Sequence, residues 1–422
     1  MPALPLPVLV IPALPLPVLA MPTLAMPALS STPLPLFTAP PLRRRAPLLL
    51  AIALLLAFSQ PVLAETAKAR KKPAQRQAKS VAAAANMAKP AKPAKAAKAA
   101  KAVEAYPYGR RDDAMALAEQ LAERHGLPPD WARAQLAQAR QLPVVARLIM
   151  PPPAGTAKNW AAYRARFIEP DRVRAGLAFW AANERWLDAA EQRYGVPASV
   201  LVGVIGVETF YGRIMGNFRV LDALSTLSLD FPSGRKDRSA FFRDELGQFL
   251  RLSYTEQLAP NSIKGSFAGA IGLGQFMPGS INRFAVDFDG DGHIDMVASA
   301  ADVIGSVAHY LAEHGWQRGQ PTHYAVKPPV DSADRAALLL PDILPSFSAT
   351  QMIERGAALD EAGTAHNGPL ALVELQNGDA APSYVAGTQN FYAVTRYNWS
   401  SYYALAVIEL GQAVAAARSG SR

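Results

Sequence analysis

A single carboxylate lies within an otherwise apolar stretch of this 422-residue chain. Residues 199–211 read SVLVGVIGVETFY, an apolar helical pattern in which Glu208 is the one acid. Desolvation favours the protonated form of a carboxyl group, so an acid held there is suited to donate a proton near neutral pH. The alternative is structural: Glu208 emerges at the helix end and pairs with Arg213. The composition of this segment leaves both interpretations open.

A glycine-rich segment follows the acid. Residues 264–278 read KGSFAGAIGLGQFMP, with polar Ser266 and Gln275 on either side of the glycines. Glycine allows tight turns and close approach of backbone to a neighbour. The segment is not a phosphate-binding loop, because no strand precedes it and the GK[ST] ending is missing.

A second chemistry is indicated by residues 287–295, which read DFDGDGHID. The pattern matches the first half of an EF-hand loop, with Gly292 at the sharp turn. Position 12 is Ala298 rather than Glu, and the next carboxylate stands four residues later. The expected ligands of a structural Ca²⁺ are Asp287, Asp289, Asp291, His293 (through its carbonyl) and Asp302. The alternative is an Asp/Gly-rich turn that holds no metal.

Composition removes several classes of protein. The chain has no cysteine, which excludes disulfide scaffolds, thiolate zinc sites, cysteine nucleophiles and a lipid-modified cysteine. Its six histidines form no HExxH motif. Residues 1–105 hold 14 Lys/Arg and two acids, whereas residues 106–422 hold 29 and 32. The folded part therefore has a net charge of −3, which argues against nucleic acid as a partner.

The first 64 residues are predicted to be an N-terminal extension followed by a signal peptide. Twelve prolines among residues 1–42 forbid a continuous helix, and we assign this stretch no function. Three arginines at 43–45, an apolar run over 48–58 and small residues before Ala64 are typical of a secretory signal. Cleavage after Ala64 and a periplasmic location are expected. The apolar run is too short to span a bilayer, so no transmembrane span is expected in the mature chain.

Residues 65–105 form a Lys/Ala/Pro tract with no aromatic residue. A segment with so little to bury is expected to be a disordered linker. It is either a solvated spacer or a cationic tether to an anionic surface.

The remaining chain is predicted to be mainly helical. Apolar residues at helical spacing, several runs closed by glycine, predict helices over Arg111–His125, Pro129–Arg140, Asp171–Tyr194, Asp302–His314 and Asn398–Ala417. Residues 321–396 differ, with more β-branched and aromatic residues and frequent turns. Leu370–Leu375 before Asn377-Gly378 predicts a strand entering a hairpin, and Phe391–Val394 is a second candidate strand.

These motifs together resemble the membrane-bound lytic transglycosylase B family (glycoside hydrolase family 103). The resemblance covers residues 106–420, and the blocks that carry it, in chain order, are YRARFIEP, GVIGVETFYG, LDALSTL, KGSFAGAIGLGQFMP, AVDFDGDGHIDM, IGSVAHYLAEHGW and NFYAVTRYNWSSYYALAV.

The resemblance implies one catalytic domain over residues 106–422. Its fold class would be mainly α: a lysozyme-like (α+β) core at about 195–320 with a flanking helical region. A small β-rich insertion at about 321–396 and a closing helix over 398–418 would complete it.

The implied activity is non-hydrolytic cleavage of the β-1,4 bond between N-acetylmuramic acid and N-acetylglucosamine, leaving a 1,6-anhydro end. Ordinary glycosidases need two carboxylates, whereas only Glu208 stands out here. One carboxyl group suffices if it first protonates the departing oxygen and then takes the proton of the muramoyl 6-hydroxyl. A hydrolytic muramidase and a non-catalytic wall-binding scaffold are the alternatives.

The family motifs also imply a set of substrate-binding residues. Tyrosines suit a glycan cleft, because the ring packs on a sugar face while the hydroxyl binds polar substituents. The implied residues are Tyr163, Ser266, Gln275, Tyr310, Tyr397, Asn398, Tyr403 and, near the peptide side, Arg238. No organic cofactor is expected. The expected partners are peptidoglycan glycan strands and possible cell-wall synthesis or division proteins. His309 departs from the family pattern, because it stands where asparagine is usual.

Overall fold

A computed structural model describes residues 106–150 and 158–420. The predicted extension, signal peptide and linker over residues 1–105 lie outside the described residues. No helix among the described residues is both long and apolar enough to cross a membrane.

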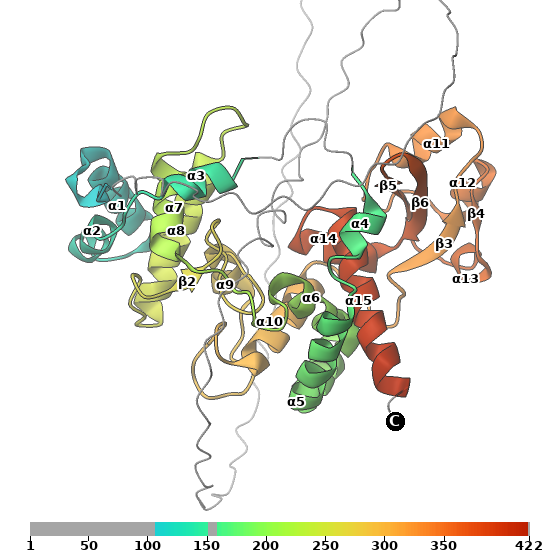
Figure 1. The fold of residues 1–422 in the computed structure, drawn as a ribbon, viewed down its shortest axis with the longest axis horizontal. Helices are drawn as coiled ribbons and strands as arrows, with labels where there is room; N and C mark the ends of the chain where they lie inside the picture. Colours follow the sequence, from blue (N-terminus) through green and yellow to red (C-terminus); the bar gives the residue numbers. More distant parts are fainter. Residues whose placement is uncertain (1–105, 151–157, 421–422) are drawn as a thin grey trace, which may run out of the picture. The chain divides into compact units, whose positions relative to one another are not determined.

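Helix α6 (Ala198–Thr209) is buried along nearly its whole length and carries Glu208 in its last turn. It packs against α5 (Pro170–Tyr194) and α15 (Ser401–Gly420), and the three helices lie together in Figure 1. The glycine of α6 at 203 is required by this contact, because a Cβ there would lie 2.2 Å from the Val407 carbonyl oxygen. The backbones of α6 and α15 are therefore in direct contact at this point.

The helices predicted from the sequence are confirmed, with shifted ends. They are α1 (Asp112–His125), α2 (Pro129–Ala137), α5, α10 (Ala300–Glu313) and α15. Helices α1 and α5 end at glycines with a left-handed backbone, φ 65° at Gly126 and 73° at Gly195. Gly315 has φ 86° just after α10. Glycine adopts this left-handed conformation without the steric cost that a side chain adds. The glycines therefore predicted the helix ends correctly.

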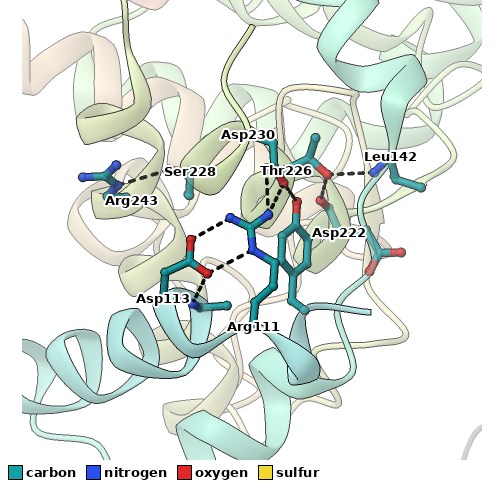
Figure 2. A network of polar contacts seen from close by, with 10 residues as sticks. Arg111, Asp113, Leu142, Asp222, Thr226, Ser228, Asp230 and Arg243 are labelled. Carbon is teal, nitrogen blue, oxygen red and sulfur yellow. Dashed lines mark hydrogen bonds and ion pairs between the residues drawn. The ribbon is translucent and has the colours of Figure 1, made fainter. Parts of the chain in front are cut away.

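A helical region flanks the core. It contains η1 (Tyr108–Arg110), α1, α2 and α3 (Pro143–Leu148), which pack with α7 (Val220–Leu229) and α8 (Ser239–Thr255). Figure 2 shows how the Arg111 side chain joins Asp113 and Asp230. Asp230 also accepts the hydroxyl of Tyr108 at 2.5 Å. In the same network Thr226 accepts the backbone N–H of Leu142 at 2.9 Å. The region is thus tied to α7 and the residue after it by partly buried polar contacts.

Two short strands and two helices frame the glycine-rich segment. Strand β1 (Phe218–Arg219) pairs antiparallel with β2 (Lys264–Gly265), which leads into the segment. Helix α9 (Pro278–Phe284) follows it, and α10 packs against both α9 and α5. Isolated bridges join Ile271 to Gly265 and to Phe276, so the segment folds back on itself.

The inserted subdomain has a four-stranded antiparallel sheet in the order β4-β3-β6-β5. Its elements are β3 (His323–Lys327), α11 (Ser332–Leu339), α12 (Ala349–Glu354), β4 (Ala358–Leu359), α13 (Glu361–Thr364), β5 (Ala371–Asn377) and β6 (Ala380–Gly387). The predicted hairpin at Asn377-Gly378 is confirmed by the β5–β6 pairing. A small separate core forms around Leu338, Met352 and Leu372.

The second candidate strand, Phe391–Val394, is wrong. These residues lie in helix α14 (Gln389–Tyr397), where Thr388 caps the start by accepting the Asn390 backbone N–H. Phe391 and Val394 are both fully buried, three residues apart on one helix face. A four-residue apolar run suits a strand or a buried helix equally, so periodicity could not decide between them.

Candidate active site

Glu208 is held by a tyrosine from the far end of the chain. Its Oε1 accepts a hydrogen bond of 2.6 Å from the Tyr403 hydroxyl on α15. The structural alternative, an ion pair with Arg213, is not present among the described residues; the Arg213 guanidinium lies over the Phe210 ring at 4.6 Å instead. The Glu208 side chain is partly exposed, so it can meet a ligand as well as its tyrosine partner.

The surroundings of Glu208 change its acidity. Desolvation raises its pKa to about 7, and the Tyr403 hydrogen bond partly opposes that rise. A carboxyl group with this pKa holds its proton near neutral pH and can release and regain it there. The chemical requirement stated for a single acid/base is therefore met by the local environment.

The charge of Glu208 affects the pKa values of three tyrosines. Burial raises the pKa of Tyr163, Tyr397 and Tyr403, and the Glu208 carboxylate adds to the rise in each. Tyr397 and Tyr403 stack with ring centroids 6.2 Å apart. Tyr310 packs against Tyr397 at 5.1 Å. Three of the four predicted tyrosines therefore lie near the acid, and Tyr310 joins them through Tyr397.

The four tyrosines differ in what they can touch. Tyr403 is fully buried and its hydroxyl is engaged with Glu208, so its geometry is that of a positioning residue. Tyr397 donates its hydroxyl to the Gly274 carbonyl, and Tyr310 donates to the Arg396 carbonyl at 2.7 Å. Tyr163, on α4 (Trp160–Arg164), is partly exposed and packs against Phe167 at 5.1 Å.

The glycine-rich segment is pinned near the acid by backbone contacts. Gly272 must be glycine, because it has φ 74° and a Cβ would lie 1.8 Å from the Met296 carbonyl oxygen. Gln275 has a left-handed backbone, and its amide donates to the carbonyls of Met215 at 3.1 Å and Gly272 at 2.8 Å. Buried Ser266 accepts the Ala270 N–H at 3.0 Å. Both predicted polar residues therefore hold the segment in shape.

Two supporting residues were missed by sequence reasoning. Thr209, next to the acid, donates to the Leu273 carbonyl at 2.9 Å and so joins α6 to the glycine-rich segment. Arg172 on α5 donates to the Gly206 carbonyl at 2.7 Å and lies over Phe210 at 4.4 Å. Thr209 adjoins the acid in the sequence, which is a usable signal; Arg172 stands 36 residues before the acid and carries none.

Arg238, Asn398 and His309 are the other residues that the sequence singled out. Arg238 precedes α8 and its guanidinium lies over Phe241 at 4.6 Å. Asn398 directly follows Tyr397, and its carbonyl accepts the Ser400 N–H at 2.6 Å. The imidazole of His309 approaches the Phe284 carbonyl at 2.9 Å. No described contact joins Arg238 or His309 to the tyrosine group around Glu208.

Three of the predicted metal ligands converge. Carboxylate oxygens of Asp287, Asp289 and Asp302 all lie within 4.8 Å of one another. Asp302 is buried at the start of α10 and also accepts two backbone N–H groups of the loop. The Asp291 carboxylate is not in this group; it accepts the His293 N–H at 2.8 Å. A set of hard oxygens around a sharp glycine turn fits Ca²⁺.

Known proteins resemble this chain over most of its length. A family model described as a transglycosylase SLT domain matches residues 109–412. Membrane-bound lytic murein transglycosylase B of Escherichia coli (strain K12) is 40% identical over 319 residues, 74% of this chain and 85% of that protein.

Solved structures agree with the family model. Escherichia coli lytic transglycosylase Slt35 in complex with calcium has a TM-score of 0.64 and 39% identity, covering 74% of this chain and 95% of that one. SltB3 from Pseudomonas aeruginosa in complex with NAG-anhNAM-pentapeptide has a TM-score of 0.60 and 28% identity, covering 71% and 78%. The lysozyme-like, mainly helical fold expected from the sequence is confirmed.

Proposed function

The chain belongs to the transglycosylase SLT domain family, and we propose that Glu208 is the single acid/base of its reaction. Members of this family are lytic transglycosylases, enzymes that act on peptidoglycan, and this chain is one of them. The observation that carries the proposal is the 2.6 Å hydrogen bond from Tyr403 to a glutamate whose pKa desolvation raises to about 7.

The reaction would proceed in two proton transfers. Protonated Glu208 gives its proton to the glycosidic oxygen as the bond to the muramoyl anomeric carbon breaks. The resulting carboxylate then takes the proton of the muramoyl 6-hydroxyl, whose oxygen bonds to the same carbon. Glu208 ends protonated as it began, no water is consumed, and the product carries a 1,6-anhydro ring.

The glycan would lie against the partly exposed side chains of Tyr163 and Tyr397, with buried Tyr310 packed behind Tyr397. We propose these three tyrosines as sugar-packing residues, with Asn398, Ser266, Gln275 and Arg238 as polar contacts. The proximity of Tyr163 and Tyr397 to Glu208 supports their share of this proposal most directly. Tyr403 would act through Glu208 rather than on the sugar.

A replacement at Glu208 tests the proposal. Glu208→Gln keeps the size of the side chain but removes the titrating proton, so release of soluble fragments from peptidoglycan sacculi should fall at least about a thousandfold. Glu374→Gln is the matched control, since Glu374 also accepts a tyrosine hydroxyl, that of Tyr384 in the inserted sheet. Retained cleavage by the Glu208 variant at a normal melting temperature would overturn the assignment.

The calcium loop would have a structural role. The convergence of Asp287, Asp289 and Asp302 supports a bound Ca²⁺, and the relative Slt35 was solved with calcium. The backbone carbonyl of His293 and the Asp291 carboxylate stay proposed as further ligands. Bound calcium would offset the repulsion among the carboxylates and hold the loop ahead of α10.

The domain limits and location of the chain are also proposals. Residues 106–422 would form the catalytic domain, with the insertion at about 321–396. The basic and apolar pattern before Ala64 supports export to the periplasm. Amino-terminal sequencing of the protein recovered from a periplasmic fraction tests this, with Glu65 expected as the first residue.

A further inference from the structure

A pocket of about 420 Å³ opens between the flanking helical region and the β1–β2 ribbon. Its lining comes from four separate stretches of chain: Pro107, Ala137, Gln138, Arg140, Arg219 and Asn261. The pocket adjoins the polar network of Figure 2 through Asp222, which accepts the Arg140 backbone N–H at 3.0 Å. None of the predicted glycan-binding residues lines it.

Two guanidinium groups face this pocket with donors to spare. The Arg140 side chain is exposed and makes no hydrogen bond or ion pair among the described residues. Arg219 contacts Asp222 through Nη1 at 3.5 Å and donates from Nη2 to the Gln138 carbonyl at 3.4 Å. Each terminal nitrogen of a guanidinium group carries two N–H groups, so Arg219, whose side chain is 28% exposed, keeps one further donor on each.

A third cation strengthens the charge. Lys264 lies directly opposite Arg219 in the antiparallel β1–β2 pair. Side chains of directly opposed residues share one face of such a ribbon. The facing acid, Asp222, is nearly fully buried beneath them, so the open side of the pocket is cationic. Gln138 and Asn261 are joined to each other at 3.0 Å and line its rim.

We propose that this pocket binds a carboxylate of the peptide stems that peptidoglycan carries. The inference rests on the proposed function for its choice of polymer. Within peptidoglycan the sugar chain is uncharged, and the free carboxylates belong to the peptides. Arginine pairs recognise carboxylates through two parallel hydrogen bonds, which the free donors of Arg140 and Arg219 allow. The pocket would hold a stem while β2 leads the chain on to the glycine-rich segment beside Glu208.

Direct binding gives the first test. The whole protein is titrated by calorimetry with a free stem tetrapeptide, and with the same peptide amidated at its carboxyl groups. We expect the amidated peptide to bind at least about tenfold more weakly, and Arg140→Gln to reduce binding of the free acid by a similar factor. Arg133→Gln is the matched control, because Arg133 is an exposed arginine of α2 that pairs with Glu119 away from the pocket.

Turnover gives the second test and separates this inference from the catalytic one. Intact sacculi are compared with sacculi whose stem carboxyl groups have been amidated, because removal of the peptides would free a lactyl carboxylate on each muramic acid. Arg140→Gln should raise KM threefold to tenfold on intact sacculi and leave the amidated sacculi unaffected. Equal binding of both peptides, or an equal effect on both substrates, would overturn the pocket. A wild-type protein that cuts neither substrate would instead overturn the proposed reaction, and the calorimetry would still decide the pocket.

Discussion

The carboxyl group of Glu208 is subject to two opposed influences. Desolvation by the apolar helix around it raises its pKa, and the hydroxyl of Tyr403 stabilises the charged form and lowers it. The balance near 7 depends on both. An acid that must also serve as a base benefits from such a value, because neither state is strongly favoured at working pH.

Replacement of Tyr403 by Phe should move the pH profile in a defined direction. Loss of the hydrogen bond removes the influence that lowers the pKa of Glu208, so the pKa rises. The alkaline limb of kcat/KM on soluble glycan strands should therefore shift to higher pH. Tyr402→Phe, the neighbouring tyrosine on α15 bonded to the Gln376 backbone, is the control and should leave that limb in place. A limb that stays put or moves to lower pH in Tyr403→Phe would contradict this account.

The same acid should cost stability at neutral pH. In the unfolded chain Glu208 loses its proton near its ordinary pKa of 4.5, whereas the folded protein holds it to about 7. Stability should therefore fall as pH rises between these values and level off above them. Glu208→Gln should gain up to about 3 kcal/mol over wild type between pH 4 and pH 8. Urea unfolding at both pH values measures this, and a difference independent of pH would disprove it.

Some residues of the candidate site could be identified from the sequence, and others could not. Glu208 could be found because one acid interrupts an apolar helix, and the tyrosines because they lie in recognisable blocks. The partnership of Glu208 with Tyr403 could not be found from spacing, since 195 residues separate them. Arg172 escaped for the same reason: its contact with the Gly206 carbonyl exists only once α5 packs on α6.

At the scale of elements, α6 and α15 approach closely through reciprocal glycines. A Cβ on Gly203 would lie 2.2 Å from the Val407 carbonyl, and one on Gly411 would lie 2.1 Å from the Ser199 carbonyl. This contact brings Tyr403 to Glu208. The sequence could not name α15 as the neighbour of α6, because the two helices are about 200 residues apart in the chain.

Gly203→Ala should separate the two helices. The added methyl group meets backbone, which cannot yield as a flexible side chain would, so a loss of about 1–3 kcal/mol is expected. Cleavage should fall by more than the change in folded fraction explains, because Tyr403 moves away from Glu208. Melting curves and sacculus digestion at a temperature where the variant stays folded measure both effects. A variant with wild-type melting temperature and activity would show that the α6–α15 contact accommodates a methyl group at residue 203, and would contradict this prediction.

The calcium loop is an element whose stability should depend on a ligand. Chelation should lower the melting temperature, and calcium at a hundredfold excess over its Kd should restore about 2.7 kcal/mol. Asp289→Asn should abolish this response. Asp295→Asn is the matched control, since its carboxylate accepts backbone N–H groups outside the converging set. Identical melting curves with chelator and with calcium would remove the metal from the account.

The whole molecule joins parts of the chain that the sequence shows only as separate runs. Arg111 and Tyr108 both reach Asp230, about 120 residues away, and fix the flanking helical region to α7. The sequence predicted that this region was helical but not what it touches, because polar contacts of this kind leave no periodic pattern. Helix α14 was missed for a similar reason: burial of Phe391 and Val394 in the folded protein, not a pattern in the sequence, favours helix over strand there.

Analysis of the products tests the central claim most directly. Purified peptidoglycan sacculi are digested by the wild-type protein and the released fragments are weighed by mass spectrometry, before and after borohydride. Intramolecular attack by the muramoyl 6-hydroxyl predicts 1,6-anhydro ends that are one water lighter and resist reduction. The Glu208→Gln protein should release none of them. Reducible muramic acid ends from the wild type would show that water attacks instead, and would contradict the mechanism proposed for Glu208.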